Sequence, residues 1–183
     1  MGISYTLRDN KPKFGNTSIN KITVDYIDSI LEPNDIILEL GSGPGSTLGL
    51  GDKYKLFSVE NQLEWVDKYP KHTTYIKCRS KKYDELYLKP EEFPNDVAWY
   101  HPDDIFSNLP EKYDLILIDG PGGWSHGWGR GGFYKHIDKF NTNVPMVFDD
   151  VNREEELILL KLISSYVKRD YFILEDNITG IIL

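Results

Sequence analysis

Short apolar runs alternate with amphipathic stretches along most of the chain. Runs of strand length occur at residues 36–40, 55–60, 73–78, 113–119 and 144–149, and two more close the chain at 171–174 and 180–183. Helical spacing of apolar residues separates most of them, at residues 17–31, 62–69, 101–109, 133–140 and 152–168. Strands that alternate with helices predict a parallel sheet covered on both faces. The short link between the last two runs predicts an antiparallel pair.

These elements predict a single Rossmann-like α/β domain over residues 1–183, a three-layer sandwich with a seven-stranded, mostly parallel sheet and an antiparallel C-terminal strand. The 183 residues are 40% hydrophobic, which suits one good core. Residues 1–16 are polar and predict an N-terminal arm, and residues 79–101 form an insertion longer than a usual connection. We expect Thr17 and Ser18 to cap the helix that follows the arm.

The strand over 36–40 runs into a turn with Gly41, Gly43 and Gly45 at spacing two. Glycines permit positive φ and let a ligand approach the main chain at the carboxyl end of a central strand. Glu39, the acid that precedes the turn, favours a cationic ligand over an anionic one. The candidate cofactor-binding residues of this stretch are Glu39, Gly41, Ser42, Gly43, Gly45 and Ser46.

Two cofactor classes use such a turn. A dinucleotide fingerprint requires Gly-x-Gly-x-x-Gly and a long helix, whereas here the third glycine comes one position early and the next strand follows closely. Glu-Leu-Gly-Ser-Gly-Pro-Gly-Ser resembles motif I of class I S-adenosylmethionine-dependent methyltransferases. That resemblance implies S-adenosylmethionine as the cofactor and methyl transfer as the reaction.

An acid also ends the second predicted strand. Glu60 stands about twenty residues past the glycine turn, where a carboxylate can accept hydrogen bonds from both hydroxyls of a ribose. The sequence Ser-Val-Glu-Asn resembles the family's ribose-binding position, so Asn61 is a candidate beside Glu60. Capping of a following helix is the alternative role for this acid.

Three aspartates end two further strands. Asp119 follows one strand, and Asp149 with Asp150 follows the next, so their oxygens can converge on a hard cation such as Mg²⁺. The spacing from Ile-Asp-Gly to Phe-Asp-Asp-Val resembles catechol-type and macrolide-sugar O-methyltransferases, which implies a metal that activates a substrate hydroxyl. The alternative is that Asp150 and Asn152 cap the helix over 152–168.

Residues 122–132 combine several glycines with large aromatic side chains. Trp124 and Trp128 can stack on a sugar ring, and Arg130 can pair with a carboxylate or phosphate of the substrate. His126 is a candidate general base, and Asp119 is the other candidate catalytic residue. Ile-Asp-Gly-Pro followed by Gly-Arg also resembles plant glucuronoxylan O-methyltransferases, which implies a glycan acceptor.

Charge and cysteine content narrow the choice of partners. A net charge of −8 with scattered lysines and arginines makes a nucleic-acid substrate an unfavourable hypothesis. The single cysteine, Cys78, excludes an internal disulfide. No signal peptide or membrane-length apolar run is seen, which predicts a cytoplasmic protein that binds no membrane.

The sequence thus predicts an S-adenosylmethionine-dependent O-methyltransferase for a small molecule, most plausibly a sugar or glycan unit. Two other classes stay open, an NAD-dependent oxidoreductase and a cofactor-binding accessory protein without activity. N- and C-methylation, metal dependence and a homodimer also stay open.

Overall fold

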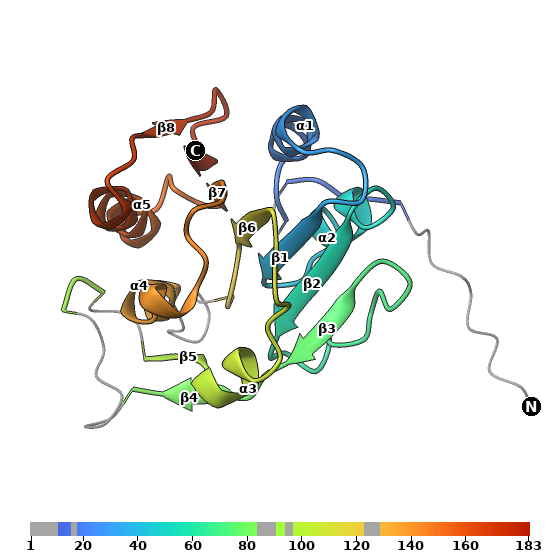
Figure 1. Ribbon diagram of the computed structural model, residues 1–183, viewed down its shortest axis with the longest axis horizontal. Coiled ribbons are helices and arrows are strands. Elements are labelled where there is room, and N and C mark those ends of the chain that lie inside the picture. Colours follow the sequence, from blue (N-terminus) through green and yellow to red (C-terminus); the bar gives the residue numbers. More distant parts are fainter. Residues whose placement is uncertain (1–10, 16–17, 84–90, 94–96, 123–128) are drawn as a thin grey trace, which may run out of the picture.

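The structure is a computed structural model, and it describes residues 11–15, 18–83, 91–93, 97–122 and 129–183. Its main feature is a seven-stranded sheet with the order β3-β2-β1-β6-β7-β9-β8 (Figure 1). The strands of this sheet are β1 (Ile36–Leu40), β2 (Lys55–Glu60), β3 (Thr74–Lys77), β6 (Leu115–Ile118), β7 (Met146–Phe148), β8 (Tyr171–Ile173) and β9 (Gly180–Ile182). The pairs among β3, β2, β1, β6 and β7 are parallel, and β9 is antiparallel to both β7 and β8. The predicted Rossmann-like fold with a reversed C-terminal strand is confirmed.

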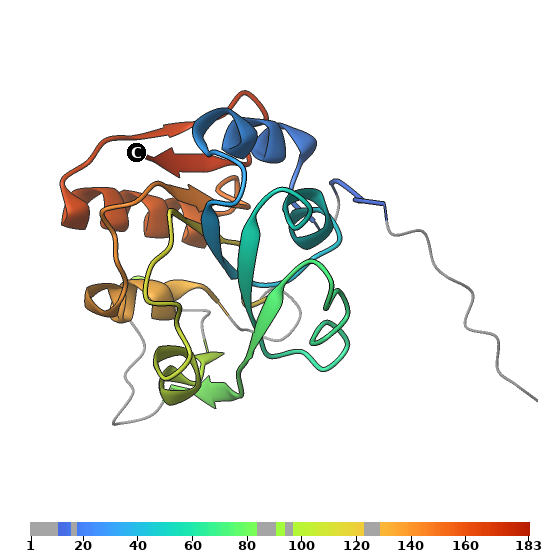
Figure 2. The same ribbon diagram turned by 45° about the vertical axis from the view of Figure 1, so that its right-hand side comes forward.

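Helices cover both faces of the sheet (Figures 1 and 2). They are α1 (Lys21–Ile30), α2 (Ser46–Leu50), α3 (Pro102–Phe106), α4 (Gly131–Lys135), a 3₁₀ helix (Ile137–Lys139) and α5 (Glu154–Val167). Successive strand residues point to opposite faces, so Ile37 packs in the core under α1 and α2, while Leu38 packs in the core under α3, α4 and α5. Both cores are built from apolar strand residues, which explains why the strands read as continuous apolar runs.

The chain reverses its direction of travel across the sheet at β1. It runs from β1 outward through β2 to β3, and then returns to β6 on the other side of β1. Ligands in open α/β sheets bind at the carboxyl ends of the two strands that flank such a reversal. The glycine turn after β1 and Asp119 after β6 therefore lie at the position where this fold binds ligands.

The insertion over 79–101 does not join the main sheet. Its described part pairs β4 (Ser80–Lys82) with β5 (Ala98–Tyr100) in a separate antiparallel sheet, so Trp99 and Tyr100 do not join the main sheet. Both side chains are buried, and α4 covers that of Trp99. A Cβ atom on Gly132 of α4 would lie 2.2 Å from the indole of Trp99, so the helix packs directly on this ring.

The structure corrects the sequence predictions for one helix and for the caps of two others. Residues 62–69 form turns and no helix, because Asp67 has a left-handed φ of 58° and Leu63 projects into solvent without an apolar face to bury. Helix α1 begins at Lys21 without a side-chain cap, and Ser18 instead accepts a hydrogen bond from the backbone of Gly45 at 2.7 Å. Helix α5 likewise begins without the side-chain cap expected over 152–155.

None of the helices in the described parts of the chain combines the length and the apolar character that crossing a membrane requires.

Candidate functional site

The glycine turn is supported from behind by a buried carboxyl group. Glu39 is fully buried, and it accepts hydrogen bonds from the hydroxyls of Thr47, at 3.0 and 3.1 Å, and of Ser58. The Thr47 oxygen in turn accepts a hydrogen bond from the backbone N–H of Gly43 at 3.1 Å. Burial raises the pKa of Glu39 to about 7. Glu39 thus holds the turn in place through Thr47 and lies away from solvent.

Glu60 ties the end of β2 to the same turn. Its carboxylate accepts the backbone N–H groups of Ser42 at 3.0 Å and of Asn61 and Gln62 at 2.7 Å each. Burial raises its pKa, and the three N–H donors oppose that shift. An ionised carboxylate has about four acceptor sites, so a ligand hydroxyl can still donate to it. The side-chain oxygen of Asn61 is buried and has no hydrogen-bond partner among the described residues.

The turns after β1 and β6 approach each other so closely that only glycine fits. A Cβ atom on Gly41, whose φ is +95°, would lie 2.9 Å from the Cα of Gly120, and a Cβ atom on Gly120 would lie 2.7 Å from the Cα of Gly41. The backbone of both turns is therefore bare of side chains where the two strands end.

The three aspartates meet as the sequence predicts. One carboxylate oxygen from each of Asp119, Asp149 and Asp150 lies within 4.8 Å of the others. The parallel pairing of β6 with β7 brings them together, since Asp149 donates its backbone N–H to Ile118 at 3.0 Å. Asp149 is buried, and its Oδ1 has no hydrogen-bond partner among the described residues.

Arg130 lies against these aspartates and away from any open surface. Its side chain is 5% exposed, and its guanidinium donates to Asp150 at 2.7 Å, to Asp119 at 3.4 Å and to the carbonyl oxygen of Asp149 at 2.7 Å. Glu156, in the first turn of α5, lies 4.0 Å from its Nε. The sequence analysis missed Glu156, although the three consecutive acids at the start of this helix were a visible signal.

The cluster has more carboxyl groups than guanidinium groups. Burial first, and then the charge of Asp149, raise the pKa of Asp119 well above its ordinary value, against the opposing effect of Arg130. Burial likewise raises the pKa of Asp149 and of Glu156. Burial lowers the pKa of Arg130, but the surrounding acids, led by Asp119, raise it more, so it stays charged. The buried guanidinium of Arg130 therefore faces four carboxyl groups, and Arg153, which is partly exposed, also pairs with Asp150 at 2.9 Å.

Tyr100 is a second residue that the sequence analysis missed. Its hydroxyl is buried without a hydrogen-bond partner among the described residues, and a Cβ atom on Gly120 would lie 2.4 Å from it. Burial raises the pKa of Tyr100 well above 10, so the hydroxyl keeps its proton. The only sequence signal was the apolar pair Trp99-Tyr100 at the end of a polar insertion.

The remaining predicted site residues fall outside this arrangement. Trp124, His126 and Trp128 lie outside the described residues. Ser46 is fully buried at the start of α2. Asp104, in the first turn of α3, pairs with Arg79 at 2.8 Å.

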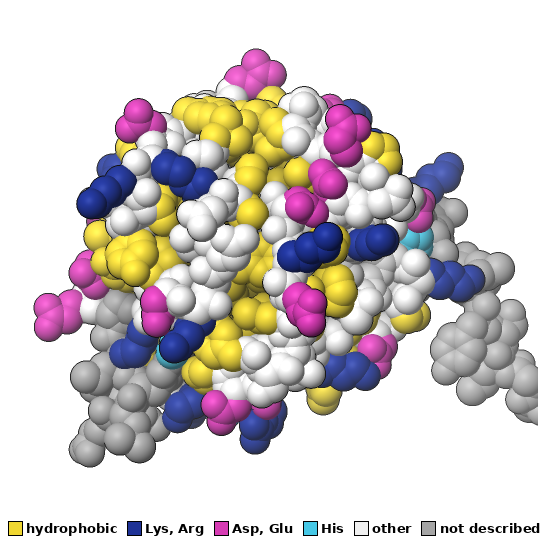
Figure 3. Space-filling model, viewed as in Figure 1, with side chains coloured by type: hydrophobic (Ala, Val, Ile, Leu, Met, Phe, Trp, Pro, Cys, Tyr) yellow, Lys and Arg dark blue, Asp and Glu magenta, His cyan; other side chains and the backbone are white. Residues whose placement is uncertain are grey.

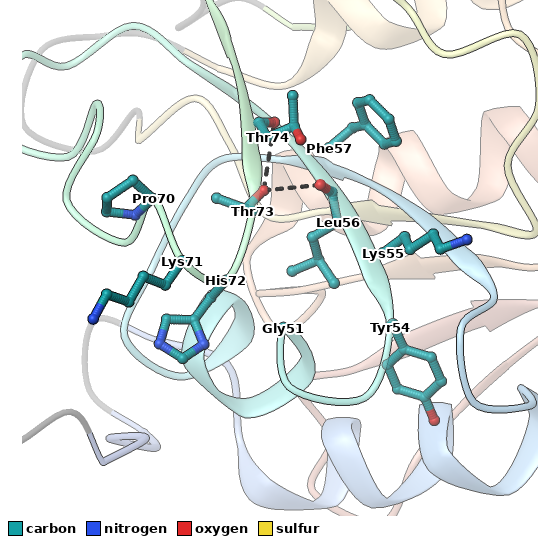
Figure 4. Close-up of a pocket in the computed structure, with 10 residues that line it drawn as sticks. All are labelled: Gly51, Tyr54, Lys55, Leu56, Phe57, Pro70, Lys71, His72, Thr73 and Thr74. Atoms are coloured by element: carbon teal, nitrogen blue, oxygen red, sulfur yellow. Dashed lines mark hydrogen bonds between the residues drawn. The ribbon is translucent and has the colours of Figure 1, made fainter.

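A pocket of about 320 Å³ opens at the opposite edge of the sheet (Figure 4). It lies where β2 and β3 begin, and its polar lining includes Thr73, whose hydroxyl donates to the carbonyl oxygen of Leu56. The side chains of Lys55 and Lys71 point away from each other in Figure 4 and do not converge on a common point. This pocket is separate from the carboxyl ends of β1, β6 and β7.

Several solved structures with a similar fold are methyltransferases or methyltransferase-like proteins. A methyltransferase-like protein from Silicibacter pomeroyi superposes with a TM-score of 0.61 at 14% identity, covering 95% of this chain and 89% of its own. The C-terminal domain of precorrin-6Y C5,15-methyltransferase from Rhodobacter capsulatus gives a TM-score of 0.55 at 10% identity, covering 92% and 86%. The chain shares their fold.

One further neighbour was solved with ligands. It is the methyltransferase MycE of the mycinamycin biosynthetic pathway, in complex with Mg and SAH, with a TM-score of 0.51 at 15% identity. The match covers 88% of this chain and 45% of that one. No family model and no curated protein sequence matches the chain.

Proposed function

We propose that the protein is an S-adenosylmethionine-dependent methyltransferase. One hydrogen bond carries this proposal, because it links the two parts of the expected cofactor site. The Glu60 carboxylate at the end of β2 accepts the backbone N–H of Ser42 in the glycine turn. A free acceptor site on Glu60 suits a ribose hydroxyl, and the unpartnered amide oxygen of Asn61 lies beside it. The shared fold with methyltransferase structures supports the same cofactor class.

The short helix α2 argues against a dinucleotide. A pyrophosphate binds the free N–H groups at the start of a long helix. Here the helix spans five residues, Ser18 occupies the N–H of Gly45, and the N–H of Thr47 donates to Gly43. The fully buried Glu39 adds a carboxyl group directly behind the turn.

We further propose that the acceptor atom is a hydroxyl oxygen of a small substrate, a sugar or glycan unit. The aspartate cluster lies at the end of β6, next to the turn that would hold the cofactor, so the acceptor would meet carboxyl groups there. Burial raises the pKa of Asp119 well above its ordinary value, which makes its ionised form a stronger base than an ordinary aspartate. The stacking role of Trp124 and Trp128 and the base role of His126 remain proposals from the sequence.

The cluster also has the features of a Mg²⁺ site. Its ligand atoms are carboxylate oxygens, the Oδ1 of Asp149 is buried without a partner among the described residues, and four carboxyl groups outnumber the guanidiniums of Arg130 and Arg153. A bound divalent cation would lower the pKa of the acceptor hydroxyl. Arg130 would hold Asp119 and Asp150 in position and offset part of their repulsion. The structure of MycE with Mg and SAH supports testing this ion first.

Calorimetric titration with S-adenosylhomocysteine tests the cofactor. We expect micromolar binding by the wild type and at least a tenfold weaker affinity for Glu60→Gln, because an amide loses charge-assisted hydrogen bonds. Glu64→Gln is the matched control, since this acid lies four residues further on and is exposed. Absence of binding to folded wild-type protein, with and without Mg²⁺, would overturn the proposal.

Titration with Mg²⁺ tests the metal separately. We expect Asp149→Asn to abolish Mg²⁺ binding and to leave S-adenosylhomocysteine binding unchanged. Wild-type protein that binds no Mg²⁺ would reject the metal and leave Asp119 as the general base.

A further inference from the structure

Strand β8 forms one outer edge of the seven-stranded sheet and exposes three apolar side chains in a row. Tyr171, Phe172 and Ile173 are 37%, 41% and 39% exposed. Hydrophobic side chains gather at the top of the molecule in Figure 3, where β8 lies in Figure 1. Edge strands are commonly protected against pairing by lysine, proline or a bulge, and these three residues offer no such protection.

The pairing of β8 with β9 determines which main-chain groups face outward. Phe172 is opposite Ile181, and Leu174 donates its N–H to Thr179 at 2.9 Å. Main-chain groups alternate in direction along an antiparallel strand, so those of Phe172 and Leu174 point towards β9. The N–H and C=O groups of Tyr171 and Ile173 therefore point away from the sheet and can pair with another strand.

We propose that this edge binds a second copy of the chain, with the two β8 strands antiparallel and Phe172 on the twofold axis. In that register Tyr171 of one copy is opposite Ile173 of the other, and both have outward-facing main-chain groups. Each such pair can exchange two hydrogen bonds, and the two Phe172 residues face each other as a non-hydrogen-bonded pair, whose side chains are closest. The contact is the same on both copies, as a closed twofold dimer requires.

The charges that flank β8 favour the same arrangement. Lys168, Arg169 and Asp170 precede the strand and together carry a net charge of +1, and Glu175 and Asp176 follow it and carry −2. Antiparallel pairing about Phe172 brings the basic end of one copy to the acidic end of the other, and the exposed side chains of Lys168 and Glu175 lie among these groups. A parallel arrangement would place like charges side by side. The strand is thus complementary to itself, which identifies a second copy as the partner.

Disulfide cross-linking tests the register. The native Cys78 is buried and is the only cysteine, so an added thiol reports on its own position. Across the axis, Phe172→Cys places two Cα atoms about 4.5 Å apart, within reach of a disulfide, whereas Tyr171→Cys places them beyond about 7 Å. We expect mild oxidation to cross-link Phe172→Cys at least tenfold faster than Tyr171→Cys. Equal rates for the two variants would overturn the proposal.

Sedimentation velocity tests the interface without a cross-link. We expect a concentration-dependent dimer for the wild type, and at least a tenfold weaker dimer for Ile173→Lys. Leu183→Lys is the matched control, because Leu183 is also exposed and apolar but lies beyond the end of β9. A monomer at all concentrations up to about 100 μM, or a dimer that Ile173→Lys leaves intact, would overturn the proposal. Cofactor binding is measured separately, so failure of either proposal is recognised independently.

Discussion

Two groups of buried carboxyls lie at the same edge of the sheet and are satisfied in different ways. Glu39 and Glu60, at the ends of β1 and β2, receive their hydrogen bonds from neutral hydroxyl and backbone donors. Asp119, Asp149 and Asp150, at the ends of β6 and β7, face one another and the buried guanidinium of Arg130, and Asp150 also pairs with Arg153. Each carboxyl of the first group already accepts at least three hydrogen bonds, whereas the second group has more carboxyl groups than guanidinium groups.

This difference assigns the two groups different tasks. Donors that are already in place hold the glycine turn rigid, which lowers the entropy lost when a cofactor binds. Carboxyls with raised pKa values and an unpartnered oxygen are costly to fold, and such strain gathers at sites of chemistry. We therefore place cofactor binding at the first group and methyl transfer at the second.

Removal of Arg130 breaks the charge balance of the second group. We expect Arg130→Met to lower the free energy of unfolding by about 3–5 kcal/mol, because it leaves buried acids without their cation. Chemical denaturation at pH 7 measures this loss. Arg79→Met is the control, since Arg79 is exposed and its pair with Asp104 should contribute far less to stability. Equal losses for the two variants would mean that the aspartates hold no net charge.

Neutralisation of Glu39 tests the first group through its pH dependence. Burial raises the pKa of Glu39 from its ordinary 4.5 to about 7, so the native state binds more protons than the unfolded state between these values. The contribution of Glu39 to the free energy of unfolding is therefore complete below pH 4.5. It falls by about 3 kcal/mol as the pH rises to 7, for a pKa shift of this size.

We expect Glu39→Gln to remove that decline. Denaturation of both proteins at several pH values between 4.5 and 7 measures it. A wild type and a variant with parallel pH profiles would contradict the raised pKa. The aspartates contribute a slope of the same sign in both proteins, because their pKa values are also raised, so the difference between the profiles isolates Glu39.

The turn after β1 and the turn after β6 approach each other closely and so bring the two groups of carboxyls together. Substitutions at Gly41 and Gly43 test this approach. Gly41→Ala places a Cβ atom 2.9 Å from Gly120 at a φ of +95°, and we expect a loss of about 2–3 kcal/mol together with weaker binding of S-adenosylhomocysteine. Gly43→Ala should cost less, since its nearest neighbours would be 3.5 and 3.6 Å away. Thermal melts and calorimetry compare the two variants, and equal effects would contradict the close approach.

The sequence predicts the first group of carboxyls better than the second. Glu60 ends an apolar run, so its place at the sheet edge follows from the period of the strand, and the aspartates follow by the same rule. The direction in which the Arg130 side chain points cannot be predicted from the strand period, because it depends on how α4 packs against α5. Tyr100 was missed for the same reason, since the burial of β5 depends on its contact with α4. The helix expected over 62–69 failed because it has no apolar face to bury.

The smallest expected effect concerns Thr47, which connects Glu39 to the glycine turn. Thr47→Val keeps the shape of the side chain but removes the oxygen that donates to Glu39 and accepts the N–H of Gly43. We expect a loss of about 1–2 kcal/mol in chemical denaturation, because a buried N–H group loses its partner while Ser58 still donates to Glu39. Thr47→Ser keeps the oxygen and should retain most of the stability. If valine and serine gave equal stability, the hydroxyl would not be the link, and the rigidity of the turn would rest on Glu60 alone.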